Sequence, residues 1–155
     1  MATYSFKSVG KTQSQVKNES VKKTIMPYGI KTPMQLGITE GIFAMNYSIE
    51  AQFSDNLRNL LLTNWGERVG LYQFGANLKG LTTEFASQDD FDSEAIVRIK
   101  EAVEKWMPFI ELENFSSEID RMQIKNTAVV KLNITYNIPL INVSGKGIQI
   151  ILYVI

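Results

Sequence analysis

The spacing of hydrophobic residues changes along the chain, from a helical period in its middle to a strand period near its end. The first helical repeat consists of Phe53, Leu57, Leu60 and Leu61. Because apolar residues three or four positions apart line one face of a helix, this repeat predicts an amphipathic helix. We expect Ser54 or Asp55 to cap its start, and Gly66 to mark its end. A second, shorter helix is predicted from Ala76 to Phe85.

The longest helical pattern lies in the segment SQDDFDSEAIVRIKEAVEKWMPFIEL. Its predicted apolar stripe consists of Ile96, Ile99, Val103 and Trp106. We expect Asp92 or Ser93 to cap the helix and Pro108 to stop it, because Pro lacks the N–H that a helix interior requires. Two pairs of opposite charge four residues apart would add about 0.3 kcal/mol each. These pairs are Glu94 with Arg98 and Glu101 with Lys105.

After the long helix, polar and apolar residues alternate as they do in β-strands. Phe109–Asp120 is predicted as one strand and Thr127–Ile138 as a second. The apolar face of the second strand consists of Val130, Leu132, Ile134, Tyr136 and Ile138. Pro139 and the pair Ser144 and Gly145 predict turns before the last apolar segment. The whole pattern predicts an α+β fold, in which about three helices pack on one face of a small antiparallel sheet of C-terminal strands.

The last segment, GIQIILYVI, is apolar on both faces of a strand. One face carries Ile148, Ile150, Leu152 and Val154, and the other carries Ile151, Tyr153 and Ile155. Such a strand can be central, with helices on one side and the N-terminal residues on the other, or it can pair with a strand of another subunit, and the two can coexist. In the second case, main-chain hydrogen bonds to an open sheet edge supply affinity and alternate side chains supply specificity. The sequence leaves both alternatives open.

The N-terminal residues differ in composition from the rest of the chain. Residues 1–40 interleave Ser, Thr, Lys and Asn with several Gly and Pro residues, and no helical repeat persists there. Such a segment buries too little apolar surface to fold alone, so we expect an extended arm laid on the domain or on a partner. Residues 41–155 are predicted to form a single domain, because 155 residues with 45 % hydrophobic content suit one core.

Two missing residue types limit the chemistry that the chain can perform. There is no Cys and no His, which excludes disulfides, thiolate metal sites and catalytic triads that depend on His. No stretch approaches the roughly 20 apolar residues of a membrane span, so we expect a chain that is cytoplasmic when made and has no membrane contact. Without a Gly-rich phosphate loop, we also expect no cofactor and no small-molecule substrate.

Charges are balanced overall but unevenly distributed. The chain has 16 basic and 16 acidic residues, so a general affinity for nucleic acid is not expected. Residues 1–40 contain six Lys and two Glu, whereas residues 81–121 contain eleven acids and four basic residues. Because charged patches control association rate and register, this asymmetry indicates electrostatic complementarity to partner proteins.

Four short motifs in a fixed order resemble the baseplate wedge proteins of contractile-tailed phages of the T-even type. The motifs are Leu57-x-x-Leu60-Leu61-Leu62-Thr63, Gly66-Glu67-Arg68, Phe74-Gly75-x-x-Leu78 and Trp106-x-Pro108-x-Ile110. The same family includes phage tail protein W and the matching component of bacterial contractile injection systems. The resemblance covers roughly residues 45–155. The family commonly carries Glu-Pro-Arg after the long helix, whereas this chain has Met107-Pro108-Phe109, so only the Pro carries over.

The resemblance implies a structural role in the virion. Members of the family sit in the tail baseplate close to the tube, hold other wedge proteins together and present a small sheet on which the first sheath ring forms. Sheath subunits join by exchanging terminal strands, so the tail sheath subunit is an implied partner. The apolar C-terminal strand, residues 148–154, fits that scheme.

The charged pair Glu67 and Arg68 admits two interpretations. As a structural latch, within the domain or across a subunit boundary, Arg68 would join the end of the preceding helix to a carboxylate or to several backbone carbonyls. As a catalytic site, Glu67 or Glu84 would work with Asp89 or Asp90 in a peptidoglycan hydrolase, a label that some family members carry; such enzymes need two carboxylates, one with a raised pKa. Nothing in the spacing selects these carboxylates among 16, so we expect no catalytic activity.

Overall fold

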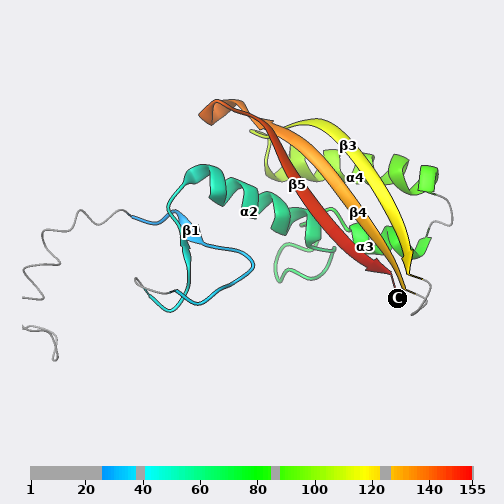
Figure 1. Cartoon of the computed structure of the whole chain (residues 1–155), viewed down its shortest axis with the longest axis horizontal. Coiled ribbons are helices and arrows are strands. Elements are labelled where there is room, and N and C mark those ends of the chain that lie inside the picture. Colours follow the sequence, from blue (N-terminus) through cyan, green and yellow to red (C-terminus); the bar gives the residue numbers. More distant parts are fainter. Residues whose placement is uncertain (1–25, 38–40, 85–87, 123–126, 155) are drawn as a thin grey trace, which may run out of the picture.

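A computed structural model of the chain describes residues 26–37, 41–84, 88–122 and 127–154. Its centre is an antiparallel sheet of three long strands in the order β3-β4-β5 (Figure 1). The strands are β3 (Glu111–Met122), β4 (Thr127–Ile138) and β5 (Val143–Val154). A short 3-10 helix, η1 (Pro139–Ile141), turns the chain from β4 into β5. The predicted second strand therefore has the bounds that the alternation indicated.

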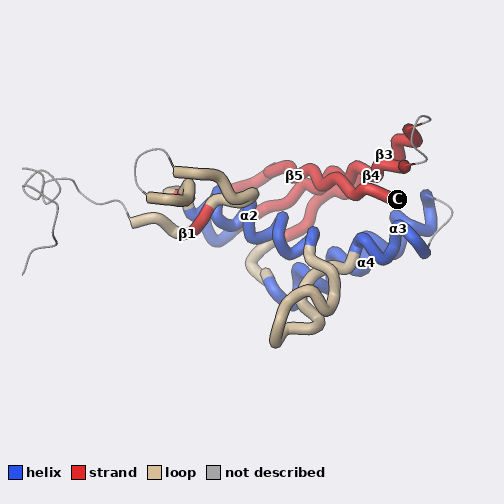
Figure 2. Tube along the Cα trace, turned by 90° about the horizontal axis from the view of Figure 1, so that it is seen from below, coloured by secondary structure: helices blue, strands red, loops and turns tan. Residues whose placement is uncertain are grey.

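Three helices cover one face of this sheet (Figure 2). They are α2 (Ile49–Leu62), α3 (Leu78–Glu84) and α4 (Gln88–Trp106). The predicted α+β architecture is confirmed, with the sheet at the C-terminal end of the chain and the helices on one side of it. The opposite face of the sheet carries the polar residues of the alternating pattern, as expected of an antiparallel sheet with one covered face.

The core lies between the helices and the inner face of β4 and β5. Five alternate residues of β4 are buried: Val130, Leu132, Ile134, Tyr136 and Ile138. They face buried Leu residues of α2 and α3 and the buried stripe of α4. Because the pairing of β4 with β5 sets Leu132 opposite Ile150 and Ile134 opposite Ile148, both strands direct apolar residues to the same side.

Residues on the N-terminal side of α2 form a small hairpin. Strand β1 (Gly29–Ile30) pairs with β2 (Met45–Asn46), and an isolated bridge joins Leu36 to Phe43. The Asp55 carboxylate of α2 accepts hydrogen bonds from the Thr32 amide and the Asn46 side chain, both 2.8 Å long. The predicted division at residue 40 stays a prediction, and residues 1–25 of the predicted arm lie outside the described part.

Both predicted helix starts were wrong. Helix α2 begins at Ile49 after Ser48, whose extended backbone makes it the N-cap. Asp55 is not a cap because its carboxylate faces the hairpin. Helix α4 begins at Gln88, and the hydroxyl of Ser93 donates to the Asp89 carbonyl one turn earlier at 2.9 Å. A Ser hydroxyl inside a helix can donate to the helix's own carbonyls, and an Asp carboxylate can accept from a neighbouring segment, so the local sequence signal was ambiguous.

The end of α2 and the stripe of α4 also differ from the prediction. Helix α2 ends at Leu62, before Gly66, because Thr63 turns to an extended conformation. On α4, Ile96 is 45 % exposed, and the buried stripe consists of Phe91, Ala95, Ile99, Ala102 and Val103. The end of α4 at Trp106, two residues before Pro108, is as predicted. Of the two predicted charge pairs, Glu94 with Arg98 is present at 3.0 Å, whereas Lys105 donates to Gln73 at 2.9 Å.

The last strand is longer than predicted and lies at an edge. It begins at Val143, so Ser144 and Gly145 belong to the strand, and the turn is made by η1 and by Asn142 in the left-handed conformation. Within the described sheet β4 is central and β5 has one open side, so the alternative of a central last strand is wrong. β4 is central because it pairs with β3 on one side and with β5 on the other. Residues 1–25 of the segment predicted to cover the outer face lie outside the described part.

Candidate functional site

The segment between α2 and α3 folds back to close the end of α2. The amide of Ala76 donates to the Leu60 carbonyl at 3.2 Å, and that of Asn77 donates to Thr63 at 3.3 Å. The Trp65 indole N–H donates to the Gly75 carbonyl at 3.0 Å, which ties the two ends of the loop together. Because the last carbonyls of a helix lack intrahelical partners, these bonds are what terminates α2.

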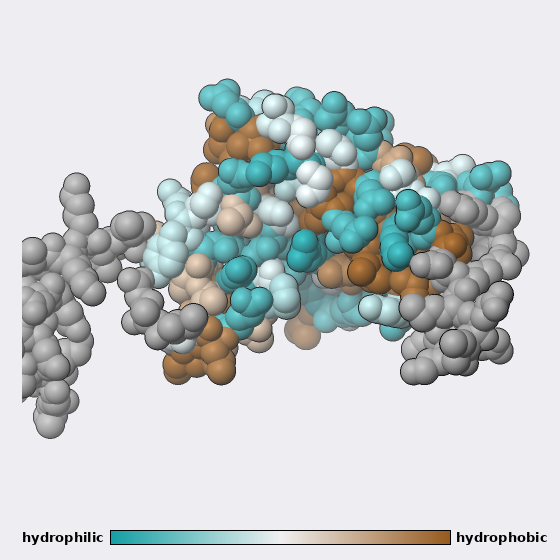
Figure 3. Space-filling view, viewed as in Figure 1, coloured by the Kyte–Doolittle hydropathy of each residue, from teal (hydrophilic) through white to brown (hydrophobic). Residues whose placement is uncertain are grey.

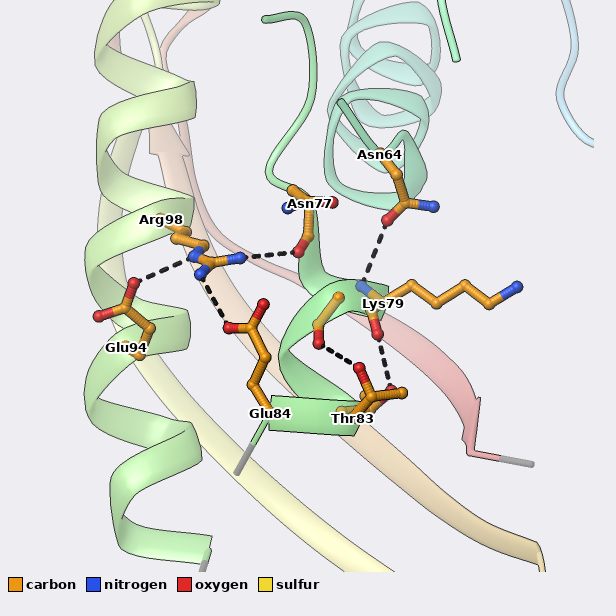
Figure 4. Close-up of polar contacts among 9 residues, drawn as sticks. Asn64, Asn77, Lys79, Thr83, Glu84, Glu94 and Arg98 are labelled. Carbon is orange, nitrogen blue, oxygen red and sulfur yellow. Dashed lines mark hydrogen bonds and ion pairs between the residues drawn. The ribbon is translucent and has the colours of Figure 1, made fainter. Parts of the chain in front are cut away.

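Glu67 holds the first turn of this loop. Its two carboxylate oxygens accept from the backbone and side-chain amides of Asn64, both at 2.8 Å. The Asn64 side-chain oxygen in turn accepts from the Lys79 amide in the first turn of α3, at 3.3 Å (Figure 4). These hydrogen bonds from Asn64 lower the pKa of Glu67 from its ordinary value of 4.5. Glu67 therefore acts as an ionised acceptor that links the end of α2 to the start of α3.

Arg68 packs on an aromatic surface. Its guanidinium carbon lies 4.3 Å from the centre of the Phe74 ring, and Phe74 meets Trp106 edge-to-face with ring centres 5.2 Å apart. Among the described residues, no hydrogen-bond acceptor contacts the guanidinium. Its N–H groups can therefore donate to a carboxylate of another chain. The predicted latch across a subunit boundary stays a prediction.

Four of the sequence-predicted residues meet in one hollow. Glu67, Arg68, Phe74 and Trp106 line a depression of about 700 Å³ together with residues of α2 and with Met107 and Phe109. Pro108, between the last two, is exposed and follows the end of α4. Met107 and Phe109 therefore give the hollow an apolar part of its lining, next to the charged pair in the same set of lining residues.

Gly66 and Gly75 are both required by backbone geometry. Gly66 has φ +84°, and a Cβ there would approach the Tyr72 ring to 3.1 Å. Gly75 has φ +109°, and a Cβ would lie 2.1 Å from the Thr63 carbonyl oxygen. Residues with side chains rarely adopt such φ values, so the loop can close onto α2 only with Gly at these positions.

Arg98 joins the helices, a role that the sequence did not predict. Arg98 of α4, whose side chain is 15 % exposed, donates to Glu94 at 3.0 Å, to the Asn77 carbonyl at 3.2 Å and to Glu84 at 3.3 Å (Figure 4). It also lies 5.5 Å from the Trp65 ring centre. Only Glu94 is a local neighbour. The other partners are 14 and 21 residues away, so no spacing rule could have shown them.

The apolar residues of β5 are buried on one face of the strand and exposed on the other. Ile148, Ile150 and Leu152 are buried under the helices. Ile151 is 41 % exposed and Tyr153 is 64 % exposed on the opposite face. Figure 3 shows apolar side chains breaking the polar surface near the C-terminal half of the sheet and at the hairpin. The side chain of Val154, and Ile155 as a whole, lie outside the described part.

The carboxylates considered for catalysis are exposed or take part in structural contacts. Glu67 accepts from Asn64, Glu84 pairs with Arg98, and Asp89 and Asp90 are exposed in the first turn of α4. The lowered pKa of Glu67 is the opposite of what a general acid needs. Within the described ranges, no three carboxylates gather closely enough to hold a metal ion. No helix in those same ranges is long and apolar enough to cross a membrane.

The hydrogen bonds of Glu67 give a pH-dependent contribution to stability. Since its folded pKa lies below the ordinary 4.5, the contribution is present above pH 4.5 and is lost as the pH falls through the folded value. We expect the Glu67→Gln variant to lose less stability than the wild type between about pH 5 and pH 3. Urea unfolding at several pH values measures this slope. Equal slopes in both proteins would show that Glu67 does not contribute.

Comparisons with known proteins show a shared fold. No family model matches the chain, and no curated protein sequence matches it. A chain of the anti-feeding prophage baseplate, solved by cryo-electron microscopy with sixfold symmetry, is similar over 70 % of this chain and 82 % of its own length, with a TM-score of 0.57 and 18 % identity. A candidate tail lysozyme from Geobacter sulfurreducens matches over 69 % of this chain and 90 % of its own, at 21 % identity and a TM-score of 0.48. The chain therefore shares the fold of the chain from the anti-feeding prophage baseplate.

Proposed function

We propose that this chain is a structural wedge subunit of a contractile tail baseplate, which joins other wedge proteins near the tube and offers a sheet edge to the tail sheath subunit. The fold shared with a chain of the anti-feeding prophage baseplate supports this proposal. The observation that carries it is the open edge of β5, which bears exposed apolar residues. The proposal places the protein in the virion tail.

The two edges of the sheet differ in how they resist strand addition. Strand β3 carries Glu111, Glu113 and Glu118 and has a register shift between Leu112 and Asn114. Charges and bulges are the devices by which proteins block edge pairing. Strand β5 has no charged residue after Lys146, which pairs with Glu50 of α2. The open edge of β5 is therefore the one suited to accept a partner strand.

A strand added at β5 would extend both faces of the sheet. Main-chain groups of the open edge would supply its hydrogen bonds. On the outer face, side chains of the new strand would lie next to Ile151 and Tyr153 and remove them from water. At about 25 cal/mol per Å² of buried apolar surface, covering two such residues favours an apolar strand over a charged one. The hollow lined by Arg68, Phe74 and Trp106 would contact a second wedge protein.

The proposal assigns no catalytic step to the chain. A peptidoglycan hydrolase needs a carboxylic acid with a raised pKa, and Glu67 has a lowered one. We expect the purified protein not to clear peptidoglycan. Clearing that disappears in the Glu67→Gln variant would establish the enzyme and overturn the structural proposal.

The test of the proposal is seeding of sheath polymers. The purified protein is mixed with the sheath subunit of the same phage, and polymers are counted by negative-stain electron microscopy. We expect seeding by the wild type and its loss in the double variant Ile151→Lys, Tyr153→Lys, because a charged edge repels strand pairing. Both side chains are exposed, so this variant should keep the fold.

A matched control places the same charges at the other edge. Asn114→Lys and Ser116→Lys add two lysines to exposed positions of β3. Seeding should persist in this control, and circular dichroism should show equal folding of all three proteins. Seeding lost in both variants, or in neither, would show that the edge of β5 is not the sheath contact.

A further inference from the structure

A second apolar surface lies at the opposite edge of the domain, between α4 and β3. It is a groove of about 470 Å³. Its apolar lining consists of Ile96, Ile99, Val103, Ile110, Leu112 and Phe115. Ile96 is 45 % exposed, and Leu112 and Phe115 are only partly buried although they point toward the core. Helix α4 packs against β3 without covering this edge, so the groove is open within the part of the chain that the structure describes.

The rim of this groove is acidic. Glu104, Glu111 and Glu113 line it with one lysine, Lys100, which lies 3.9 Å from Glu104. Glu111 and Glu113 are exposed, and the register shift next to Glu113 turns the edge away from regular strand pairing. A groove with an apolar floor and an acidic rim fits a segment that carries apolar anchors flanked by basic side chains.

The chain itself supplies a segment of that chemistry. Residues 1–25 contain five lysines and one acid, Glu19. Tyr4 and Phe6 lie two residues apart, so in an extended segment both rings would face the same side. Lys7 follows them directly and Lys11 comes four residues later.

Length does not prevent this segment from reaching the groove. The 20 residue steps from Phe6 to Met26, the first described residue, span up to about 66 Å when extended, whereas the 19 residues of α4 are about 28 Å long. We propose that residues 1–25 dock in the α4–β3 groove of their own chain, with Tyr4 and Phe6 on its apolar floor and Lys7 and Lys11 at its acidic rim. The inference does not depend on the baseplate role.

A spin-label experiment on the full chain tests this docking. Because the chain has no Cys, Ser5→Cys creates one labelling site between the two proposed anchors. Methyl spectra then report which isoleucines lie near the label. We expect loss of the Ile96 and Ile110 signals in the groove, whereas the Ile30 and Ile42 signals of the hairpin remain. Loss of all four signals alike, or of none, would overturn the proposal.

A charge swap tests the electrostatic part. Lys7→Glu with Lys11→Glu should restore the groove signals, because like charges then meet at the rim. Adding Glu111→Lys and Glu113→Lys to that variant should bring the signal loss back. Glu111 and Glu113 are exposed, and circular dichroism checks that each protein is folded. If the groove signals stay visible after Glu111→Lys and Glu113→Lys are added, the proposed contact between the lysines and the acidic rim is wrong.

A mixed sample distinguishes docking within one chain from docking between chains. Spin-labelled protein without methyl isotopes is added to isotope-labelled protein without a spin label. We expect no loss of groove signals in this mixture. Loss that appears only in the mixture would assign the groove to the N-terminal segment of a second copy and overturn docking within the chain.

Discussion

Gly75→Ala is expected to lower the free energy of unfolding by more than about 2 kcal/mol. The backbone of Gly75 has φ +109°, a conformation that costs any other residue about 1–2 kcal/mol. The added Cβ would also lie 2.1 Å from the Thr63 carbonyl oxygen, so the loop would have to move off the end of α2. That movement would break the bonds from Ala76 and Asn77 that terminate the helix.

Gly70→Ala is the matched control for this prediction. Gly70 has φ +81° in the same loop, but nothing lies within 4 Å of its added Cβ. The Gly70→Ala variant should lose only the conformational part of the free energy of unfolding, about 1 kcal/mol. Urea unfolding followed by fluorescence measures both variants, since Trp65 and Trp106 lie next to this loop. Equal losses in the two variants would show that the contact with Thr63 does not control the loop.

Arg98→Ala is expected to destabilise the domain by about 2 kcal/mol. The substitution removes the donor that joins α4 to Glu84 and to the Asn77 carbonyl. Its side chain is 15 % exposed, whereas Glu84 and Glu94 are 54 % and 40 % exposed, so solvent screens part of the attraction. The expected loss therefore lies below that of a fully buried ion pair.

Two further variants separate the geometry of Arg98 from its charge. Arg98→Lys keeps the charge but not the planar fork, so it should recover only part of the lost stability. Lys100→Ala, on the same helix, removes an exposed pair with Glu104 and should change stability by less than about 0.5 kcal/mol. Thermal unfolding of the three variants gives the comparison. A loss in Arg98→Ala no greater than in Lys100→Ala would refute the joining role.

Residues named in the ordered motifs lie close together in the structure. Gly66, Phe74, Gly75 and Trp106 were selected as an ordered motif, and the structure sets them around the end of α2. What could not be predicted is how the charged pair is used. Glu67 accepts from Asn64, three residues away, whereas Arg68 packs on Phe74 and leaves its donors open. Both arrangements depend on the path of the loop, and no periodicity records that path.

The sequence by itself determined the class of fold, because the period of apolar residues is set by the geometry of helices and strands. The alternation from Thr127 to Ile138 predicted β4 with its true bounds and its buried face. Composition alone excluded disulfides and His-dependent catalysis, because the chain contains neither Cys nor His.

Only the tertiary structure decided the order of the strands and the partners of the polar residues. The apolar character of residues 147–154 suited a central strand as well as an edge strand, and the pairing of β3 with β4 left β5 at the edge. Arg98 contacts residues 14 and 21 positions away in the sequence. Such contacts arise when helices pack on a sheet, and packing depends on all elements together rather than on any one segment.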